Sequence, residues 1–243
     1  MYSRQEIKDS LVFDIETAAN YPSFSALEKA NPKLAELWLK KHDKLLEQEI
    51  KRNGTEFENL DQEYDYIYVK YASLYPEFSK PIVISFGVFE EQPDLSFKIK
   101  VASVSSDNEK DILQETGEFL KQYKSVTLAG FNIKGFDIPY LFKKFLINQI
   151  NVPEILQIRG KKPWELKMID VMEDWKSTGW ENSSLDLVAS VMGIDSPKDK
   201  INNDEVSLFY NNKKVSLKEI EEYCEKDVTA TMKVMLKVSN YKF

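Results

Sequence analysis

Two carboxylates lie two residues apart near the end of the first apolar run of the chain. Residues 11–16 read LVFDIE, and in a strand Asp14 and Glu16 point to the same face, about 7 Å apart along the backbone. Two buried like charges are costly unless a cation neutralises them. The pair therefore belongs either to a metal site or to an ordinary strand end that runs into solvent.

Two later segments carry carboxylates that suit the same site. Asp137 follows a turn with two glycines and precedes a predicted helix over about residues 138–145, so it is either a ligand or only a helix cap. Tyr223 and Asp227 are four residues apart in a predicted terminal helix and share one face of it. That face borders the apolar stripe of the helix. The alternative is a surface aspartate beside a core tyrosine.

The histidine and cysteine content argues against several other kinds of active site. His42 and Cys224 are the only residues of their types, so a Ser-His-Asp triad, a Cys-His pair and a zinc site are not expected. Carboxylates without histidine suit hard cations such as Mg²⁺ or Mn²⁺. The net charge of −7 argues mildly against a dedicated nucleic-acid coat protein, although acidic metal ligands add negative charge themselves.

Strands and helices that alternate along the chain must position these residues. Apolar runs predict strands at residues 11–16, 81–88, 97–101 and 126–129. Helices are predicted from 31 to 54, from a capping box at 106–109, over 138–145, near 184–192 and 204–210, and from a second capping box at 216–219. This order indicates an α/β or mixed α+β sheet.

Length and composition favour one large domain, or one domain with an insertion. The chain has 243 residues, of which 42% are hydrophobic and 30% are charged, as in soluble globular proteins. No apolar run approaches the roughly 18 residues that span a bilayer, and no signal peptide is visible. We therefore expect a cytoplasmic protein that is not secreted.

Taken together, the three acidic segments resemble the motifs of the tyrosine-bearing DEDD branch of the DnaQ-like 3′–5′ exonucleases. The similarity is greatest to predicted exonucleases related to the proofreading domain of family B DNA polymerases. The matching runs are FDIET at 13–17, GFN at 130–132 with FDIPYL at 136–141, and EYCEKDV at 222–228. The resemblance also includes residues 74–78, 184–187 and 196–198, and it is weak across about 20–70.

This resemblance implies a ribonuclease-H-like α/β fold, in which helices flank a mixed β-sheet. Residues 1–243 would form a single exonuclease domain, with a helical insertion at roughly 21–80 after the first strand. The insertion carries Trp38 and a set of basic residues that would form either a strand-guiding arm or only a solvated helix. The basic residues are Lys33, Lys40, Lys41, Lys44, Lys51 and Arg52.

The resemblance also implies a site for two Mg²⁺ or Mn²⁺ ions, about 3.5–4 Å apart, that clamp the scissile phosphate. The implied metal ligands are Asp14, Glu16, Asp137 and Asp227. In the family, the aspartate at the position of Asp14 bridges the two ions. The aspartate at the position of Asp137 holds its ion mostly through water. Tyr223 would orient the attacking water rather than act as a free base, because an ordinary tyrosine pKa is near 10. The implied substrate contacts are Ile15, Thr17, Phe131, Asn132 and Phe136.

The activity implied is hydrolysis of DNA, most readily single-stranded DNA, from the 3′ end to nucleoside monophosphates. Such a protein would be bacterial or phage-encoded, would not bind membranes, and would work with replication or repair proteins. Two alternatives stay open. The same site serves RNA in related proteins, which would make the chain a 3′–5′ exoribonuclease. A catalytically silent nucleic-acid-binding or scaffolding module would keep the fold without the chemistry.

Overall fold

The structure is a computed structural model that describes residues 1–123, 126–162, 165–195 and 205–243. The chain divides into two compact units, which are described separately. The first unit comprises Met1–Glu16, Pro81–Ile201 and Leu217–Phe243, and the second comprises Thr17–Lys80 and Asn202–Ser216. The part of the family resemblance at residues 196–198 lies outside the described residues.

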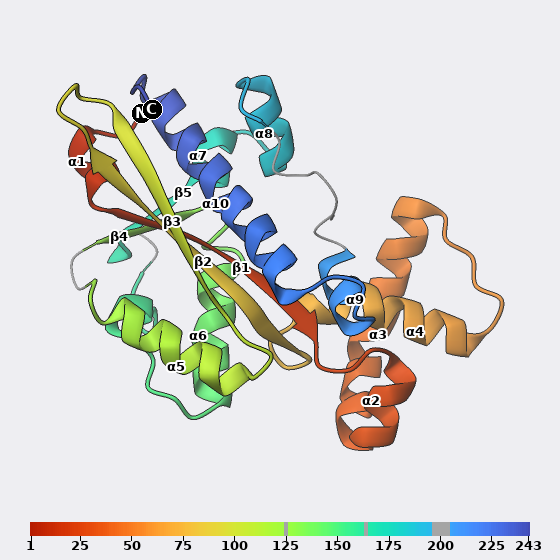
Figure 1. Cartoon of the computed structure of the whole chain (residues 1–243). Helices are drawn as coiled ribbons and strands as arrows, with labels where there is room; N and C mark the ends of the chain where they lie inside the picture. The colour runs from red at the N-terminus through yellow and green to blue at the C-terminus, as the bar shows by residue number, and fades with distance from the viewer. Residues whose placement is uncertain (124–125, 163–164, 196–204) are drawn as a thin grey trace. The chain divides into compact units, whose positions relative to one another are not determined.

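A five-stranded sheet in the order β3-β2-β1-β4-β5 forms the centre of the first unit (Figure 1). The strands are β1 (Ser10–Ala19), β2 (Ser79–Glu91), β3 (Phe97–Ser105), β4 (Thr127–Gly130) and β5 (Met168–Asp170). β4 pairs in parallel with both β1 and β5, whereas β2 and β3 are antiparallel. The sheet is therefore mixed, as predicted. β5 was not predicted, because three residues are too few to show a periodic pattern.

Helices cover both faces of this sheet (Figure 1). They are α1 (Arg4–Lys8), α5 (Glu109–Leu120), α6 (Asp137–Ile147), α7 (Val171–Lys176), α8 (Leu185–Val191) and α10 (Leu217–Val238), with a 3₁₀ turn, η2 (Glu154–Leu156). Phe13 and Ile15 pack in one core cluster with residues of α5 and α6, whereas Val12 packs in the other with residues of α10. Since strand side chains alternate, Asp14 and Glu16 share the α10 face with Val12. This confirms an α/β fold with helices on a mixed sheet.

The predicted capping box at residues 106–109 is wrong in its cap residue. α5 begins at Glu109, and the Asn108 side chain accepts a hydrogen bond from the Lys110 N–H at 3.0 Å. Ser106 Oγ accepts instead from the Asn108 N–H. Asn108 caps the helix because it directly precedes the first turn, where a short amide reaches the unpaired N–H groups.

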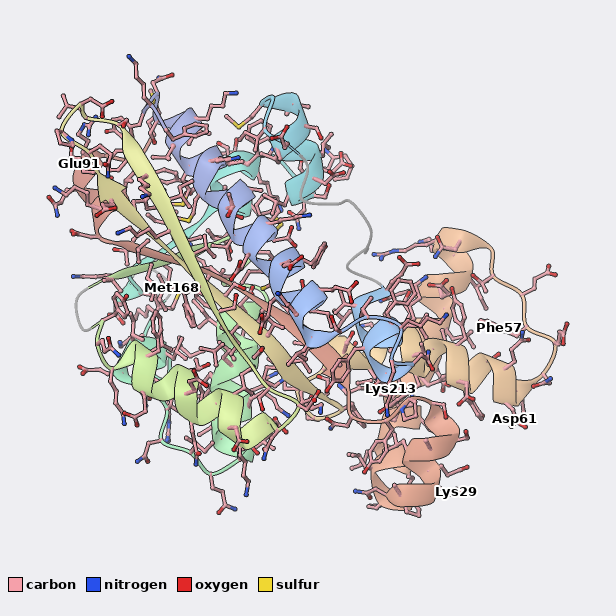
Figure 2. All side chains as sticks on the ribbon, viewed as in Figure 1. Lys29, Phe57, Asp61, Glu91, Met168 and Lys213 are labelled. Atoms are coloured by element: carbon pink, nitrogen blue, oxygen red, sulfur yellow. The ribbon has the colours of Figure 1, made fainter. Side chains whose placement is uncertain are left out.

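The short helix α1 is fixed to the end of β2. Glu91, labelled in Figure 2, accepts ion pairs from Arg4 at 2.5 Å and from Lys8 at 2.9 Å. The Arg4 guanidinium also lies over the ring of Tyr241, 4.8 Å from its centroid. These contacts join the first and last residues of the unit to the antiparallel edge of the sheet.

The second unit is helical. Its elements are α2 (Phe24–Ala30), α3 (Pro32–Asn53), α4 (Leu60–Tyr71), the 3₁₀ turn η1 (Ala72–Leu74) and α9 (Val206–Asn211). The predicted ends of α3 are confirmed: Asn31 accepts from the Leu34 N–H, Pro32 is the first residue, and Gly54 ends the helix with φ 63°. In the described part of the chain, no helix combines the length and apolarity needed to cross a membrane.

Candidate active site

The first two carboxylates and Asp137 meet at β1. Asp14 is half-buried and Glu16 is 8% exposed. Asp137 is the first residue of α6 and is 2% exposed. Its Oδ1 accepts a hydrogen bond from the backbone N–H of Ile15 at 3.1 Å. Asp137 is thus attached to β1 at Ile15, which lies between Asp14 and Glu16. A residue that only capped α6 would not need this contact with the strand.

Helix α10 brings the third segment to the same place. Tyr223, Cys224 and Asp227 are all buried. The Cys224 thiol donates to Asp14 Oδ2 at 3.4 Å and to the Asp14 backbone oxygen at 3.5 Å. One oxygen each of Asp14 and Glu16 and the Cys224 sulfur all lie within 4.8 Å of one another. A surface position for Asp227, the alternative weighed for this segment, does not apply.

The carboxylates raise one another's pKa. Burial and the Asp137 charge raise the pKa of Asp14 well above its ordinary value, against the Cys224 hydrogen bond. Burial and the charges of Asp14, Asp227 and Asp137 do the same to the pKa of Glu16. Burial, with a smaller effect of the Asp170 charge, raises the pKa of Asp137 to about 8, although the Ile15 N–H hydrogen bond opposes the shift. Burial without a bound cation therefore favours the protonated forms of these carboxyl groups.

Tyr223 and Cys224 stay protonated at neutral pH. Burial and the charges of Asp227 and Glu16 raise the pKa of Tyr223, as does its hydrogen bond to Asp227. Burial, together with the Asp14 and Glu16 charges, raises the pKa of Cys224. A protonated Tyr223 hydroxyl can orient a neighbouring group by hydrogen bonding, which is the role that the sequence analysis expects of it. Cys224 was not singled out by the sequence, although it lies between two residues of the third motif.

This donor set fits a hard divalent cation. Buried carboxylates that disfavour one another's charge gain most from a bound dication. The nearby sulfur is a thiol rather than a thiolate, so the oxygen atoms are the available ligands. These groups could hold Mg²⁺ or Mn²⁺.

The approach of α10 to the sheet depends on Gly87 of β2. A Cβ at this position would lie 2.3 Å from Met232 Sδ and 2.8 Å from Val228 Cγ1. The absent side chain therefore lets α10 lie directly on β2. Because Asp227 precedes Val228, this close packing also sets the depth of the third motif.

The predicted substrate residues of the second motif lie on one turn between β4 and α6. Asn132 is half-buried and has a left-handed backbone, with φ 66°. Phe131 packs against the core cluster that includes α10, and Phe136 against the cluster that includes α6. Both rings thus have core contacts. The polar side chains of the turn are those of Asn132 and of Lys134, which is paired with Glu173 at 2.7 Å.

The two β1 residues predicted to contact substrate are placed differently. The Ile15 side chain is buried in the core with α5 and α6, and its N–H holds Asp137. Thr17 belongs to the second unit, where its hydroxyl donates to the Ser73 backbone oxygen at 2.8 Å.

Asp170, the last residue of β5, is a buried carboxylate that the sequence analysis missed. It is 1% exposed and accepts backbone N–H groups from the Asn132 turn. The available signal was an aspartate directly after an apolar pair at residues 168–169, the same pattern that marks Asp14 after residues 11–13.

The basic residues of the second unit lie mostly on the outside of α3. Lys33, Lys40, Lys44 and Lys51 are exposed. The Lys41 ammonium lies over the Tyr75 ring, 4.5 Å from its centroid. Trp38 is fully buried against Tyr68 and Phe78, so its proposed part in a strand-guiding arm is wrong. Its aromatic surface is used for packing. The alternative of a strand-guiding arm therefore rests on the basic residues alone.

Comparison with known proteins identifies the family and the fold of the chain. Residues 73–242 match a family described as a predicted 3′–5′ exonuclease related to the exonuclease domain of PolB. No curated protein matches the chain. The fold is similar to that of the family B DNA polymerase from the hyperthermophilic archaeon Pyrobaculum calidifontis, with a TM-score of 0.56 and 14% identity. That match covers 94% of this chain but 24% of the polymerase.

The structural match supports the ribonuclease-H-like fold, and the matched residues include the second and third motifs. The resemblance seen in the sequence is confirmed. The chain belongs to the family of predicted 3′–5′ exonucleases related to the exonuclease domain of PolB.

Proposed function

We propose that this protein is a metal-dependent 3′–5′ exonuclease of the tyrosine-bearing DEDD type, which degrades single-stranded DNA to nucleoside monophosphates. The observation that carries the proposal is the convergence of Asp14, Glu16 and Asp137, with Cys224 of the third motif 3.4 Å from Asp14. The charge of Asp227 also raises the pKa of Glu16, which supports a place for Asp227 among the ligands.

Two Mg²⁺ or Mn²⁺ ions, held by Asp14, Glu16, Asp137 and Asp227, would supply positive charge to the scissile phosphate and its leaving oxygen. Tyr223 remains protonated, and its hydroxyl orients the attacking water. Asn132 holds the terminal nucleotide, because its half-buried amide lies on a turn that leads directly into Asp137, whereas Lys134 of the same turn is paired with Glu173. Single-stranded DNA is favoured over duplex DNA because a duplex end must first lose pairing and stacking, which costs a few kcal/mol.

DNA is preferred to RNA on the strength of the family, which is named for its relation to the exonuclease domain of PolB. A 3′–5′ exoribonuclease is the second candidate, since the described residues supply no observation that rejects a 2′-hydroxyl. We also propose that residues 1–243 act as one exonuclease domain, in which roughly residues 21–80 are an insertion. Replication or repair proteins are its expected partners.

Digestion of labelled oligonucleotides tests this function. A 5′-labelled DNA strand, an RNA of the same sequence and a 3′-blocked DNA are incubated with Mg²⁺, with Mn²⁺ and with excess EDTA. We expect a ladder that shortens from the 3′ end of the DNA, only in the presence of metal.

Each other outcome is informative. Undiminished digestion in EDTA would refute the metal mechanism, and fragments of the 3′-blocked strand would refute the exonuclease direction. Faster loss of RNA would make the protein an exoribonuclease. No digestion of either polymer, together with tight binding of both, would favour the silent binding module.

A further inference from the structure

The carboxylate of Asp170 connects two backbone segments. Its Oδ1 accepts from the Asn132 N–H at 2.9 Å, and its Oδ2 accepts from the Lys134 N–H at 3.0 Å. Oδ1 also accepts from Met172 at 3.1 Å and from Glu173 at 3.3 Å, so the same side chain caps α7. A buried carboxylate with four backbone donors is strongly held in one orientation.

The turn that Asp170 holds is conformationally demanding. Asn132 lies in the left-handed region, which costs most residues free energy and which asparagine and glycine tolerate best. The Asn132 amide lies against Gly135, where an added Cβ would be 2.4 Å from Asn132 Oδ1. The backbone N–H of Gly135 and that of Phe136 both bond to the Asn132 backbone oxygen. The position of the Asn132 side chain therefore depends on a backbone that Asp170 fixes from outside the turn.

Asp137 has an anchor of its own. It is held to β1 by the Ile15 N–H, on the opposite side of β4 from Asp170. The sheet order places β4 between β1 and β5, so the second motif is attached to its neighbours at two separate points. Loss of the Asp170 contact should thus disturb Asn132 while leaving the attachment of Asp137 in place.

We propose that Asp170 is a positioning residue, which holds the Asn132 turn in the conformation that binds the 3′-terminal nucleotide. This inference rests on the proposed exonuclease function and adds a residue outside the three motifs. It assigns to Asp170 an effect on substrate affinity rather than on the metal requirement.

The test is a double-mutant cycle between Asp170→Asn and Asn132→Gly. The D170N side chain would still cap α7 but would turn an N–H₂ group toward one of the turn's N–H donors. The N132G change removes the side chain and keeps the left-handed backbone. We expect D170N to raise the KM for single-stranded DNA about tenfold, the size typical of losing a group that orients another. D170N should still require Mg²⁺, because the hydrogen bond between Asp137 and the Ile15 N–H does not involve Asp170.

In the N132G background, D170N should raise KM no further, because Asp170 acts through the Asn132 side chain, which that background lacks. Amide hydrogen exchange at residues 132 and 134 should become faster in D170N. The matched control is Glu173→Gln, which removes the 2.7 Å ion pair between Lys134 and α7 but leaves the Asp170 contacts intact. Its KM should equal that of the wild-type protein.

Additive effects in the double variant would overturn the inference, as would a D170N variant that melts earlier with an unchanged KM. If D170N does not fold, Asp170→Ser replaces it, since serine caps a helix but is too short to reach the turn. Absence of digestion by the wild-type protein would overturn the proposed function itself. Wild-type digestion with an unaltered D170N enzyme would overturn this inference alone.

Discussion

At the scale of single residues, the site consists of carboxylates that stabilise the folded chain poorly until a cation joins them. Burial raises the pKa of Asp14, Glu16 and Asp137, and neighbouring carboxylates add to each shift. Their arrangement costs stability in the metal-free chain and fits the metal site that we propose. This separation of function from stability gives two predictions.

Asp14→Asn and Asp227→Asn should each lower the rate of hydrolysis by about 10³-fold or more, as expected when a central member of a catalytic group is lost. Each apo variant should melt at the same temperature as the wild type or higher, because one source of like-charge repulsion is gone. Rates on labelled single-stranded DNA and melting temperatures in EDTA measure the two effects. Wild-type activity in either variant would remove that residue from the site.

Asp137 makes the stability of the metal-free protein depend on pH. Its pKa is raised to about 8 in the folded chain, against about 4 for an ordinary aspartate. The stability it contributes is therefore complete below about pH 4 and is lost as the pH rises through about 8. Melting temperatures in EDTA should fall between about pH 5 and about pH 9, and less steeply in Asp137→Asn. A rising melting temperature in this range would contradict the burial of a protonated cluster.

At the scale of elements, the site depends on how closely α10 lies on the sheet. Gly87→Val should force α10 away from β2, because even a Cβ would meet Val228 and Met232. The expected cost is about 1–3 kcal/mol of stability, with a lower kcat because the third motif moves. Urea unfolding and single-strand digestion measure both. The control is Gly117→Ala, whose Cβ would be 3.5 Å from Phe145 and should be neutral or stabilising.

Within the second unit, Glu49 joins α3 to α4. It is fully buried and accepts hydrogen bonds from Asn53, Thr55, Tyr66, Lys70 and Tyr71. Burial opposes its charge, but the hydrogen bonds of Tyr71 and Lys70 outweigh this and lower the pKa of Glu49. The stability it contributes is present above the ordinary glutamate pKa and is lost in more acidic solution.

Glu49→Ala should destabilise the chain by about 3 kcal/mol, because it leaves Lys70 and the tyrosines without their acceptor. Glu47→Ala, on the exposed side of α3, is the matched control and should change stability little. Urea unfolding at neutral pH compares the two variants. Equal stabilities would show that the Glu49 contacts do not hold the helices together.

At the scale of the whole molecule, metal binding should couple to folding. The chain carries a net charge of −7, and its clustered carboxylates add repulsion that a dication relieves. A hundredfold excess of Mg²⁺ over its dissociation constant stabilises a binding-competent fold by about 2.7 kcal/mol. In a protein of this size, that corresponds to an increase of about 5–10 °C in melting temperature.

The measurement compares the melting temperature in Mg²⁺ with that in KCl of equal ionic strength. It is made on the wild type and on the double variant Asp14→Asn, Asp227→Asn. The double variant should not respond to Mg²⁺. An equal response would show that the ions act at other acidic residues, of which the chain has 40 in all.

The sequence by itself determined the parts of this protein that follow local rules. Alternation in a strand and four-residue spacing in a helix put Asp14 with Glu16, and Tyr223 with Asp227, on single faces. The ends of α3 follow from an asparagine cap, a proline and a glycine. The order of the three motifs was enough to indicate the family and its α/β fold.

Only the tertiary structure decided which groups from distant segments support those motifs. The Asp170 contact with Asn132 spans 38 residues, and the Cys224 contact with Asp14 spans 210. The local sequence around Trp38 does not distinguish a ligand-stacking tryptophan from a core tryptophan. Its contacts with Tyr68 and Phe78 show that it is a core residue. The physical reason is that burial and hydrogen-bond partners are set by packing between elements, which no local spacing encodes.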